Sequence, residues 1–269
     1  MQIFSSALTG LRLAFRSHVI LLATCCLLIL ALSVLLSAQF SGRQPSTVAM
    51  DIGLSVIRLL LPLALALITQ ELLSKEFERR YFLNTLSYPH TRHKILLGRL
   101  LAAALLLLVL LLVLAGTLAL LTWLIGKSYS QGTPVLLGAP FIITIGFVGL
   151  DLLVLTAVAA LLAVVATTSS FVLIGIFGFT LVARSFGTIL ELLTRNAAVV
   201  SDAETYRSSL GLLSYLLPDL SALDVRMIAL YGRMEFLPAD WPWLVLANLT
   251  YTAGFLGIAV WALQRKRFS

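Results

Sequence analysis

The chain has 269 residues, of which 60% are hydrophobic and only 12% are charged, and it carries a formal net charge of +7. An ordinary soluble domain has about a quarter charged residues, so this composition excludes a soluble protein and favours a polytopic membrane protein whose surface mostly faces lipid. The positive charge is then expected in cytoplasmic loops, and nucleic acid is not an expected partner.

Six segments have the roughly 20 mostly apolar residues needed to cross a hydrocarbon core of about 30 Å. In chain order they cover residues 19–40, 53–73, 95–125, 140–166, 171–193 and 243–263. The first segment could also be read as a cleavable signal peptide, but it is longer than a typical signal core and no cleavage site follows, so we interpret it as a helix. The sequence therefore predicts an all-α membrane protein with six transmembrane helices, forming a single transmembrane domain over residues 1–269.

The distribution of charged side chains orients these helices. Eleven of the 19 basic residues lie with three acidic residues in segments on one side, and seven basic residues lie with eight acidic residues on the other. Because Lys and Arg concentrate in cytoplasmic loops, the first side is predicted to be cytoplasmic. Both ends of the chain are predicted to lie there.

Three segments outside the spans have patterns of their own. Residues 1–18 place apolar side chains at helical spacing beside Arg12 and Arg16, which fits either a helix in the cytoplasmic interface or a plain positive flank. Residues 74–94 form a charged cytoplasmic loop. Residues 194–242 form a long external segment, predicted to contain short re-entrant or interfacial helices because its apolar stretch at 210–217 is too short to span.

The residues needed for an enzyme or a metal site are missing from the sequence. There is no Gly-rich phosphate loop ending in Lys and Ser or Thr. The three His residues fall in cytoplasmic flanks, and the two Cys residues are adjacent in an apolar run, so neither a metal site nor a disulfide framework is predicted. The chain is expected to be no enzyme and to bind no cofactor itself.

Polar side chains at membrane depth are the remaining candidates for a functional site. They are Asp151 in the fourth span and Thr180, Arg184, Thr188 and Glu191, which recur on one face of the fifth. Such groups should face protein or water, so one hypothesis is that they border a translocation path between two copies of the chain. The alternative is internal pairing, of Arg184 with Asp151 and of Glu191 with Arg195. Arg58 in the second span is interpreted as a residue that snorkels to the outer interface.

The cytoplasmic loop and the start of the third span contain a spaced motif. It consists of two acids two residues apart, a Pro thirteen residues after the first acid, an Arg three residues after the Pro, and a small residue followed by a basic one at the start of the third helix: Glu76, Glu78, Pro89, Arg92, Gly98 and Arg99. This motif resembles that of the ABC-2 type exporter permeases. The family usually has Gly-Thr where this chain has Arg80-Tyr81. The sequence Leu217-Pro218-Asp219-Leu220 and the residues 223–226 are similar to the external segment of the NosY-like branch of that family.

The resemblance implies a membrane subunit of the bacterial cytoplasmic (inner) membrane that pairs with a second copy or a paralogue to form a translocation path. Separate ABC ATPase subunits would bind ATP and Mg²⁺. The loop at 74–94 would form a short coupling helix that docks on the ATPase through Glu76, Glu78, Arg79, Arg80, Pro89, His90, Thr91 and Arg92. Rigid charged contacts of this kind suit docking to a soluble partner.

The sequence indicates less about the substrate than about the mechanism. The Met, His and Cys residues do not form a metal path across the bilayer, and a predominantly apolar interior favours a lipid-like or amphipathic substrate. The alternative function is a membrane scaffold or assembly factor for copper-enzyme or envelope maturation, without transport of its own.

Overall fold

The computed structural model describes residues 6–12, 19–74, 92–128, 135, 137–166, 168–195 and 217–265. The long helices are α2 (Val19–Phe40), α3 (Pro45–Thr69), α6 (Arg92–Ser128), α7 (Ala139–Val165), α8 (Ser169–Arg195) and α11 (Trp241–Arg265). Shorter elements are the π-helix η1 (Gln70–Ser74), α10 (Arg226–Tyr231), the 3-10 helix η2 (Met234–Phe236) and a helix at 6–12. The described residues contain no β-strand, which confirms the prediction of an all-α membrane protein.

Five of the described helices have the length and hydropathy of a membrane span, namely α2, α3 extended to Leu73, most of α6, α7 and α11. The helix α8 has 27 residues, and the part whose side chains the structure describes without a gap, Ser169–Ser185, is apolar. The helix α2 has the predicted bounds, whereas α3 begins eight residues before the predicted position 53. Pro45 explains this earlier start, because its fixed φ angle suits the first turn of a helix.

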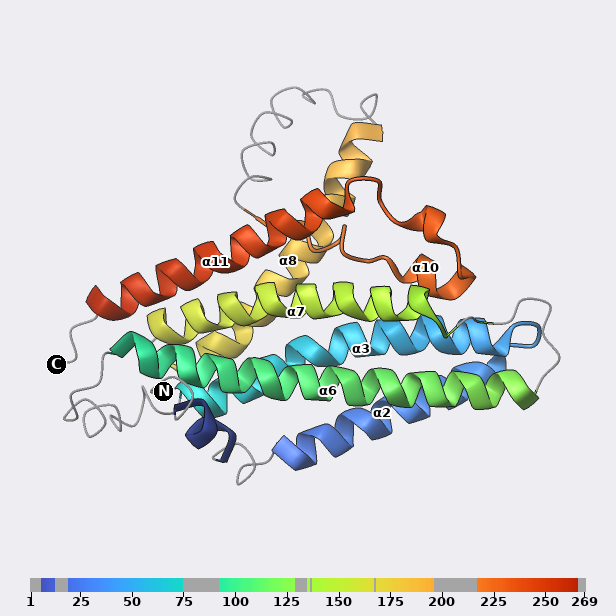
Figure 1. Cartoon of the computed structure of the whole chain (residues 1–269), viewed down its shortest axis with the longest axis horizontal. Coiled ribbons are helices and arrows are strands. Elements are labelled where there is room, and N and C mark those ends of the chain that lie inside the picture. The colour runs from blue at the N-terminus through green and yellow to red at the C-terminus, as the bar shows by residue number, and fades with distance from the viewer. Residues whose placement is uncertain are drawn as a thin grey trace.

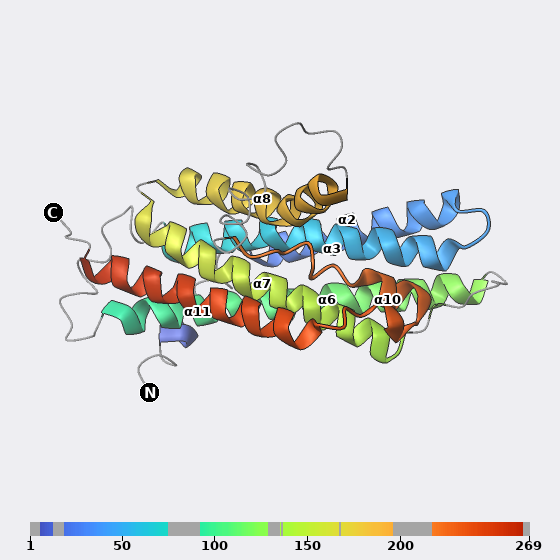
Figure 2. The same cartoon turned by 90° about the horizontal axis from the view of Figure 1, so that it is seen from above.

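The long helices run side by side, and the first and last described residues lie at the same end of the bundle (Figure 1). Figure 1 shows that residues 6–12, the start of α6 and the end of α11 lie at the same end, with α10 and the turn between α2 and α3 at the other. We call the first end inner and the second outer, following the predicted topology. Figure 2 shows that α8 and α11 lie on opposite sides of α7.

Tryptophan residues mark the two membrane interfaces along α11. Trp241 and Trp261 are twenty residues apart, or about 30 Å along the helix, which matches the hydrocarbon thickness. At the inner end the Arg265 guanidinium lies 4.3 Å from the centre of the Trp261 ring. On α6, Lys127 Nζ lies 3.8 Å from the centre of the Trp123 ring. Amphipathic ring and cation pairs of this kind are typical of residues at headgroup level.

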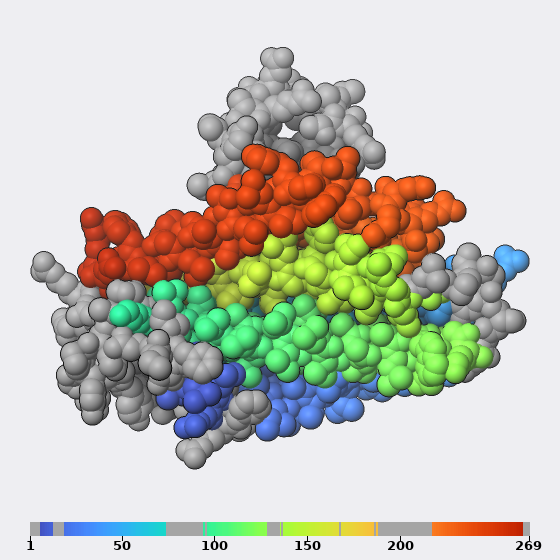
Figure 3. All heavy atoms as spheres, viewed as in Figure 1, coloured from blue at the N-terminus to red at the C-terminus, as the bar shows by residue number. Residues whose placement is uncertain are grey.

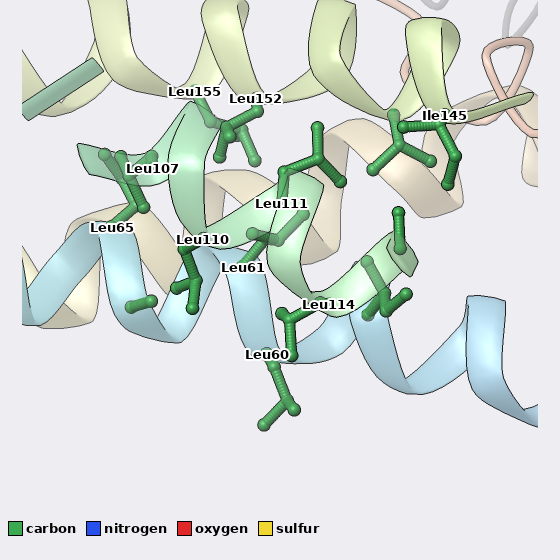
Figure 4. Packing of buried hydrophobic residues seen from close by; sticks show 14 of the residues in the cluster. Leu60, Leu61, Leu65, Leu107, Leu110, Leu111, Leu114, Ile145, Leu152 and Leu155 are labelled. Carbon is green, nitrogen blue, oxygen red and sulfur yellow. The ribbon is translucent and has the colours of Figure 1, made fainter. Parts of the chain in front are cut away.

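The hydrophobic core joins α3, α6 and α7. Figure 4 shows leucine side chains of α6 between those of α3 and those of α7, including Leu61 of α3, Leu111 of α6 and Leu152 of α7. The two helices α3 and α6 are in close contact at Gly53, where an added Cβ would overlap a methyl carbon of Leu118. Lipid tails are as apolar as leucine, so this packing is stabilised mainly by van der Waals contact rather than by removal of water.

Candidate functional site

Asp151 lies at the centre of an ion-pair network. It is the thirteenth of the 27 residues of α7 and only 2% exposed. One of its oxygens, Oδ2, lies 2.5 Å from Nη2 of Arg184 on α8 and 3.9 Å from Nη2 of Arg58 on α3. The internal pairing of Arg184 with Asp151 is therefore present. A single buried carboxylate thus joins three helices.

Arg58 extends this network away from α7. Its Nη1 lies 2.5 Å from Asp224 Oδ2, and its Nη2 donates a hydrogen bond to the backbone oxygen of Leu220 at 3.2 Å. The backbone oxygen of Arg58 in turn accepts a hydrogen bond from Arg184 Nη1 at 2.8 Å. The Arg58 side chain is only 11% exposed, so the prediction that it snorkels to the outer interface is wrong. Its partners Asp224 and the Leu220 carbonyl oxygen come from a distant part of the chain.

Arg226, at the start of α10, forms the outer part of the network. Its Nη1 lies 3.1 Å from Asp51 Oδ1 and donates to Ser55 Oγ at 2.7 Å, and its Nε lies 3.5 Å from Asp224 Oδ2. The side chains of Arg226 and Asp51 are 39% and 45% exposed. We call the six residues Asp51, Arg58, Asp151, Arg184, Asp224 and Arg226 the charge network. It contains three acids and three bases and is formally neutral.

Three groups that take part in these contacts, Asp224, Arg226 and the carbonyl oxygen of Leu220, belong to residues 217–226, which we call the outer segment. Leu220, Leu223 and Val225 are between 0% and 4% exposed, so their side chains pack inside the bundle. The backbone N–H of Leu220 donates to the Ala183 carbonyl oxygen of α8 at 3.2 Å, and Thr144 of α7 donates its hydroxyl to the Val225 carbonyl oxygen at 3.5 Å. The outer segment therefore fills the outer part of the space between α3, α7 and α8.

A glycine allows the outer segment to approach α8 closely. An added Cβ at Gly187 would lie 2.3 Å from Ser221 Oγ and 2.5 Å from Asp219 Oδ2. Asp219 Oδ1 accepts hydrogen bonds from the N–H groups of Ser221 and Ala222 at 3.0 and 3.3 Å, which closes a tight turn at this place. The turn thus rests directly on the backbone of α8.

The ion pairs of the charge network offset most of the free-energy cost of holding charges at membrane depth. A charge at the bilayer centre costs about 2.5–3.5 kcal/mol on insertion scales, and pairing with opposite charges offsets this cost. Two buried side-chain atoms of the charge network, Asp151 Oδ1 and Arg184 Nε, have no hydrogen-bond partner among the described residues. The described residues bring together no group of three or more His, Cys, Asp or Glu side chains able to hold a metal ion. The arrangement joins α3, α7 and α8 to the outer segment through ion pairs and hydrogen bonds.

The other predicted membrane-depth residues are placed as follows. Thr180 is 5% exposed, and its hydroxyl donates to the Ile176 carbonyl oxygen of its own helix at 2.7 Å. Thr188 and Glu191 belong to α8, but the structure does not describe their side chains. Asp151, Thr180 and Arg184 all face the interior of this chain. That they border a translocation path stays a prediction.

The predicted ATPase-coupling residues fall mostly outside the described part of the chain. They are Glu76, Glu78, Arg79, Arg80, Pro89, His90 and Thr91, while Arg92 is the first residue of α6. The described chain enters this stretch through η1 and leaves it through α6, both at the inner end of the bundle (Figure 1).

Sequence reasoning missed Asp51, Asp224 and Arg226 as members of the site, because each was counted only as a charge of the outer loops. One signal was present in the sequence. Apolar residues at 220, 223 and 225 alternate with the charges at 219, 224 and 226, as expected of a segment that is partly buried in protein.

Comparison with protein families shows which family this fold and these residues belong to. The family model described as "ABC-2 family transporter protein" matches residues 15–194, about two thirds of the chain. The matched range contains α2 to α7, nearly all of α8, and the four network residues Asp51, Arg58, Asp151 and Arg184. It ends before the outer segment. A search of curated proteins with the chain returns no match.

Proposed function

The chain belongs to the ABC-2 family of transporter proteins, and we propose that two such chains, identical or paralogous, form the export path for a lipid-like or amphipathic substrate. Separate ATPase subunits on the cytoplasmic side supply the energy by binding and hydrolysing ATP with Mg²⁺. The loop at 74–94 is the docking site for these subunits, and the protein resides in a bacterial inner membrane.

The observation that carries the proposal is the contact of the outer segment with three helices. Asp224 and Arg226 form ion pairs with α3, and backbone groups of Leu220 and Val225 form hydrogen bonds with α8 and α7. The helix α3 leads from the inner loop to this contact: Gln70 and Arg58 are twelve residues apart, or about 18 Å along the helix axis. A movement imposed on the loop by an ATPase therefore has a continuous helical connection to Arg58, through η1 and α3. In the proposed cycle, this movement separates Arg58 from Asp224 and Asp151, and the outer segment leaves the bundle so that substrate can exit.

Purification of the full-length protein from its native membranes tests the assignment to an ATP-driven complex. We expect a soluble-type ATPase to accompany the chain through affinity capture and gel filtration, and ATP hydrolysis by the complex to rise when lipid-like substrates are added to reconstituted vesicles. A chain that purifies alone from membranes active in export would contradict the proposal and would favour the scaffold or assembly function.

Linking the outer segment to α8 by a disulfide is expected to stop export. The double variant Gly187→Cys with Ser221→Cys places two thiols at the point where an added Cβ lies 2.3 Å from Ser221 Oγ, so they can reach the short Cβ separation that a disulfide requires. Oxidation should lower export of a fluorescent amphipathic lipid analogue by about tenfold or more, as expected when a required opening is blocked. Reduction should restore it.

The two single variants are the controls for this experiment, because Cys25 and Cys26 of α2 remain in every variant. Export by the fully oxidised double variant at the rate of the reduced protein would show that the outer segment does not need to move.

A further inference from the structure

Arg58 of α3 takes most of its described acceptors from the outer segment. Its Nη1 lies 2.5 Å from Asp224 Oδ2, and its Nη2 donates to the Leu220 carbonyl oxygen at 3.2 Å. Its other acid, Asp151, lies 3.9 Å away and is shared with Arg184, which is closer at 2.5 Å. Two of the three acceptors that the structure describes for Arg58 therefore belong to the outer segment.

Departure of the outer segment, as in the proposed cycle, affects the charges on the helices unequally. Arg184 keeps Asp151 at 2.5 Å and the Arg58 carbonyl oxygen at 2.8 Å. Asp51 loses Arg226, but its side chain is already 45% exposed, so water solvates it. The Arg58 side chain is only 11% exposed in the closed state, and departure removes the acceptors of its terminal N–H groups. Since a guanidinium in a protein stays protonated, Arg58 becomes a cation that faces the vacated space.

The part of the outer segment that fills this space combines apolar side chains with one carboxylate. Leu220, Leu223 and Val225 are between 0% and 4% exposed, and Asp224, next to two of them in the chain, contacts Arg58. Figure 3 shows that α10 (orange), which follows this segment, lies at the surface over the outer part of α7. An amphiphile with an anionic headgroup has the same two parts, an apolar chain and an acid. The outer segment thus presents to the helices what such a molecule would present.

The guanidinium of Arg58 suits an anionic headgroup. Its planar fork can donate two parallel hydrogen bonds to two oxygens of one carboxylate or phosphate. Arg184 adds a second cation nearby, since both guanidinium groups contact the same oxygen, Asp151 Oδ2. Arg184 Nε has no hydrogen-bond partner among the described residues, so the two arginines have a donor to spare. A neutral headgroup would leave the charge of Arg58 unpaired, and a cationic headgroup would be repelled.

We propose that the exported amphiphile carries an anionic headgroup, a carboxylate or a phosphate, and that this headgroup binds Arg58 at the place that Asp224 occupies in the closed state. Asp224 is then a mimic of the substrate that fills the site until the outer segment leaves. The inference rests on the proposed export function and narrows its substrate from lipid-like molecules in general to acidic ones. In both the closed and the loaded state, Arg58 is paired with one acid.

Emptying the site tests whether it binds an anion. The variant Asp224→Ala removes the carboxylate and leaves Arg58 in place. The full-length variant is purified in dodecyl maltoside, a neutral amphiphile, and its melting temperature is measured with added dodecyl phosphate or dodecanoate, which have the same alkyl chain. Because a ligand that binds only the folded protein stabilises it, we expect a rise of several degrees, and a smaller rise for the wild type, in which Asp224 competes. The larger of the two rises identifies the preferred headgroup as phosphate or carboxylate.

Control variants and a control amphiphile assign this rise to Arg58. The double variant Asp224→Ala with Arg58→Gln should show no rise. Glu235→Ala removes an exposed acid of η2 at the same end of the molecule and should respond like the wild type. Dodecyltrimethylammonium, a cation with the same alkyl chain, should not raise the melting temperature of Asp224→Ala. Asp224→Asn removes the charge and keeps the shape of the side chain, so it provides a second, more conservative variant.

A second experiment keeps Asp224 and Arg58 and measures release of the outer segment. It uses the reduced double variant Gly187→Cys with Ser221→Cys. An anion that takes the place of Asp224 should move residue 221 away from α8, so disulfide formation should become several-fold slower. Dodecyl phosphate or dodecanoate should have this effect, whereas dodecyltrimethylammonium and additional dodecyl maltoside should not.

The absence of a rise with either anion would overturn the proposal, and so would equal rises with anionic and cationic amphiphiles or a rise that persists without Arg58. Disulfide formation that neither anion slows would also overturn it. Both experiments require neither an ATPase nor transport. If they fail while an ATPase accompanies the purified chain, the export function stands and only the acidic substrate is withdrawn. If the chain purifies without an ATPase while both effects appear, the anion site stands and the export function does not.

Discussion

Replacing Asp151 with Leu is expected to cost about 3–5 kcal/mol of folding stability, which is the usual effect of removing one partner of a buried ion pair. The reason is that Arg184 loses its carboxylate partner at 2.5 Å while its charge stays at membrane depth. Arg58 keeps Asp224 and loses only the more distant of its two acids. The loss should appear as a lower yield of monodisperse protein and a lower melting temperature in detergent.

Removing the opposite charge as well should recover most of this loss. The double variant Asp151→Leu with Arg184→Leu leaves no unpaired charge, and apolar replacement of a buried pair is often neutral or stabilising. Asp51→Leu is the matched control, because its pair with Arg226 is 45% and 39% exposed and such pairs contribute about 1 kcal/mol or less. If Asp151→Leu proved as stable as Asp51→Leu, the network would not hold the bundle together.

Reversing two charges in the cytoplasmic loop is expected to separate the chain from its ATPase. In the variant Glu76→Lys with Glu78→Lys, two acids of the proposed docking helix become bases, and placing like charges together at an interface costs several kcal/mol. Since about 1.4 kcal/mol is a factor of ten in affinity, the amount of ATPase retained on the captured chain should fall by about tenfold or more, and export should fall with it.

The control for this variant is a charge reversal at the other end of the molecule. Glu235 of η2 is exposed at the outer end, so Glu235→Lys should leave both ATPase retention and export unchanged. Retention of a fully active ATPase by the double reversal would show that residues 76 and 78 do not contact it. Adding Lys at 76 and 78 reinforces the positive charge of the predicted cytoplasmic side, so the orientation of the chain should be preserved.

The presence of the long helices could be predicted from the sequence because each depends on a local property, an uninterrupted apolar stretch of sufficient length. The helix α8 was predicted from the same property, and its described part Ser169–Ser185 is apolar. The early start of α3 was missed because hydropathy is low over its first turns, whereas Pro45 determines where the helix begins.

The charge network could be predicted only in part. The pair of Arg184 with Asp151 was one of two alternatives, since both residues lie in spans and neither can remain alone there. The partners of Arg58 could not be found in the same way, because Asp224 lies 166 positions further along the chain, in a segment outside the predicted spans. Local sequence patterns indicate that a polar group is buried, but they do not indicate which distant segment of the chain provides its partner.

The division of the charge network between its two parts has a consequence for energy coupling. The helices contribute Asp51, Arg58, Asp151 and Arg184, and the outer segment contributes Asp224 and Arg226, so each part is neutral by itself. A unit charge that crosses a membrane potential of 100 mV gains or loses about 2.3 kcal/mol. Parting the two neutral halves moves no net charge across the field, so the voltage performs no work on this step. The opening and closing of the outer side would then depend on the nucleotide state of the ATPase and not on the membrane potential.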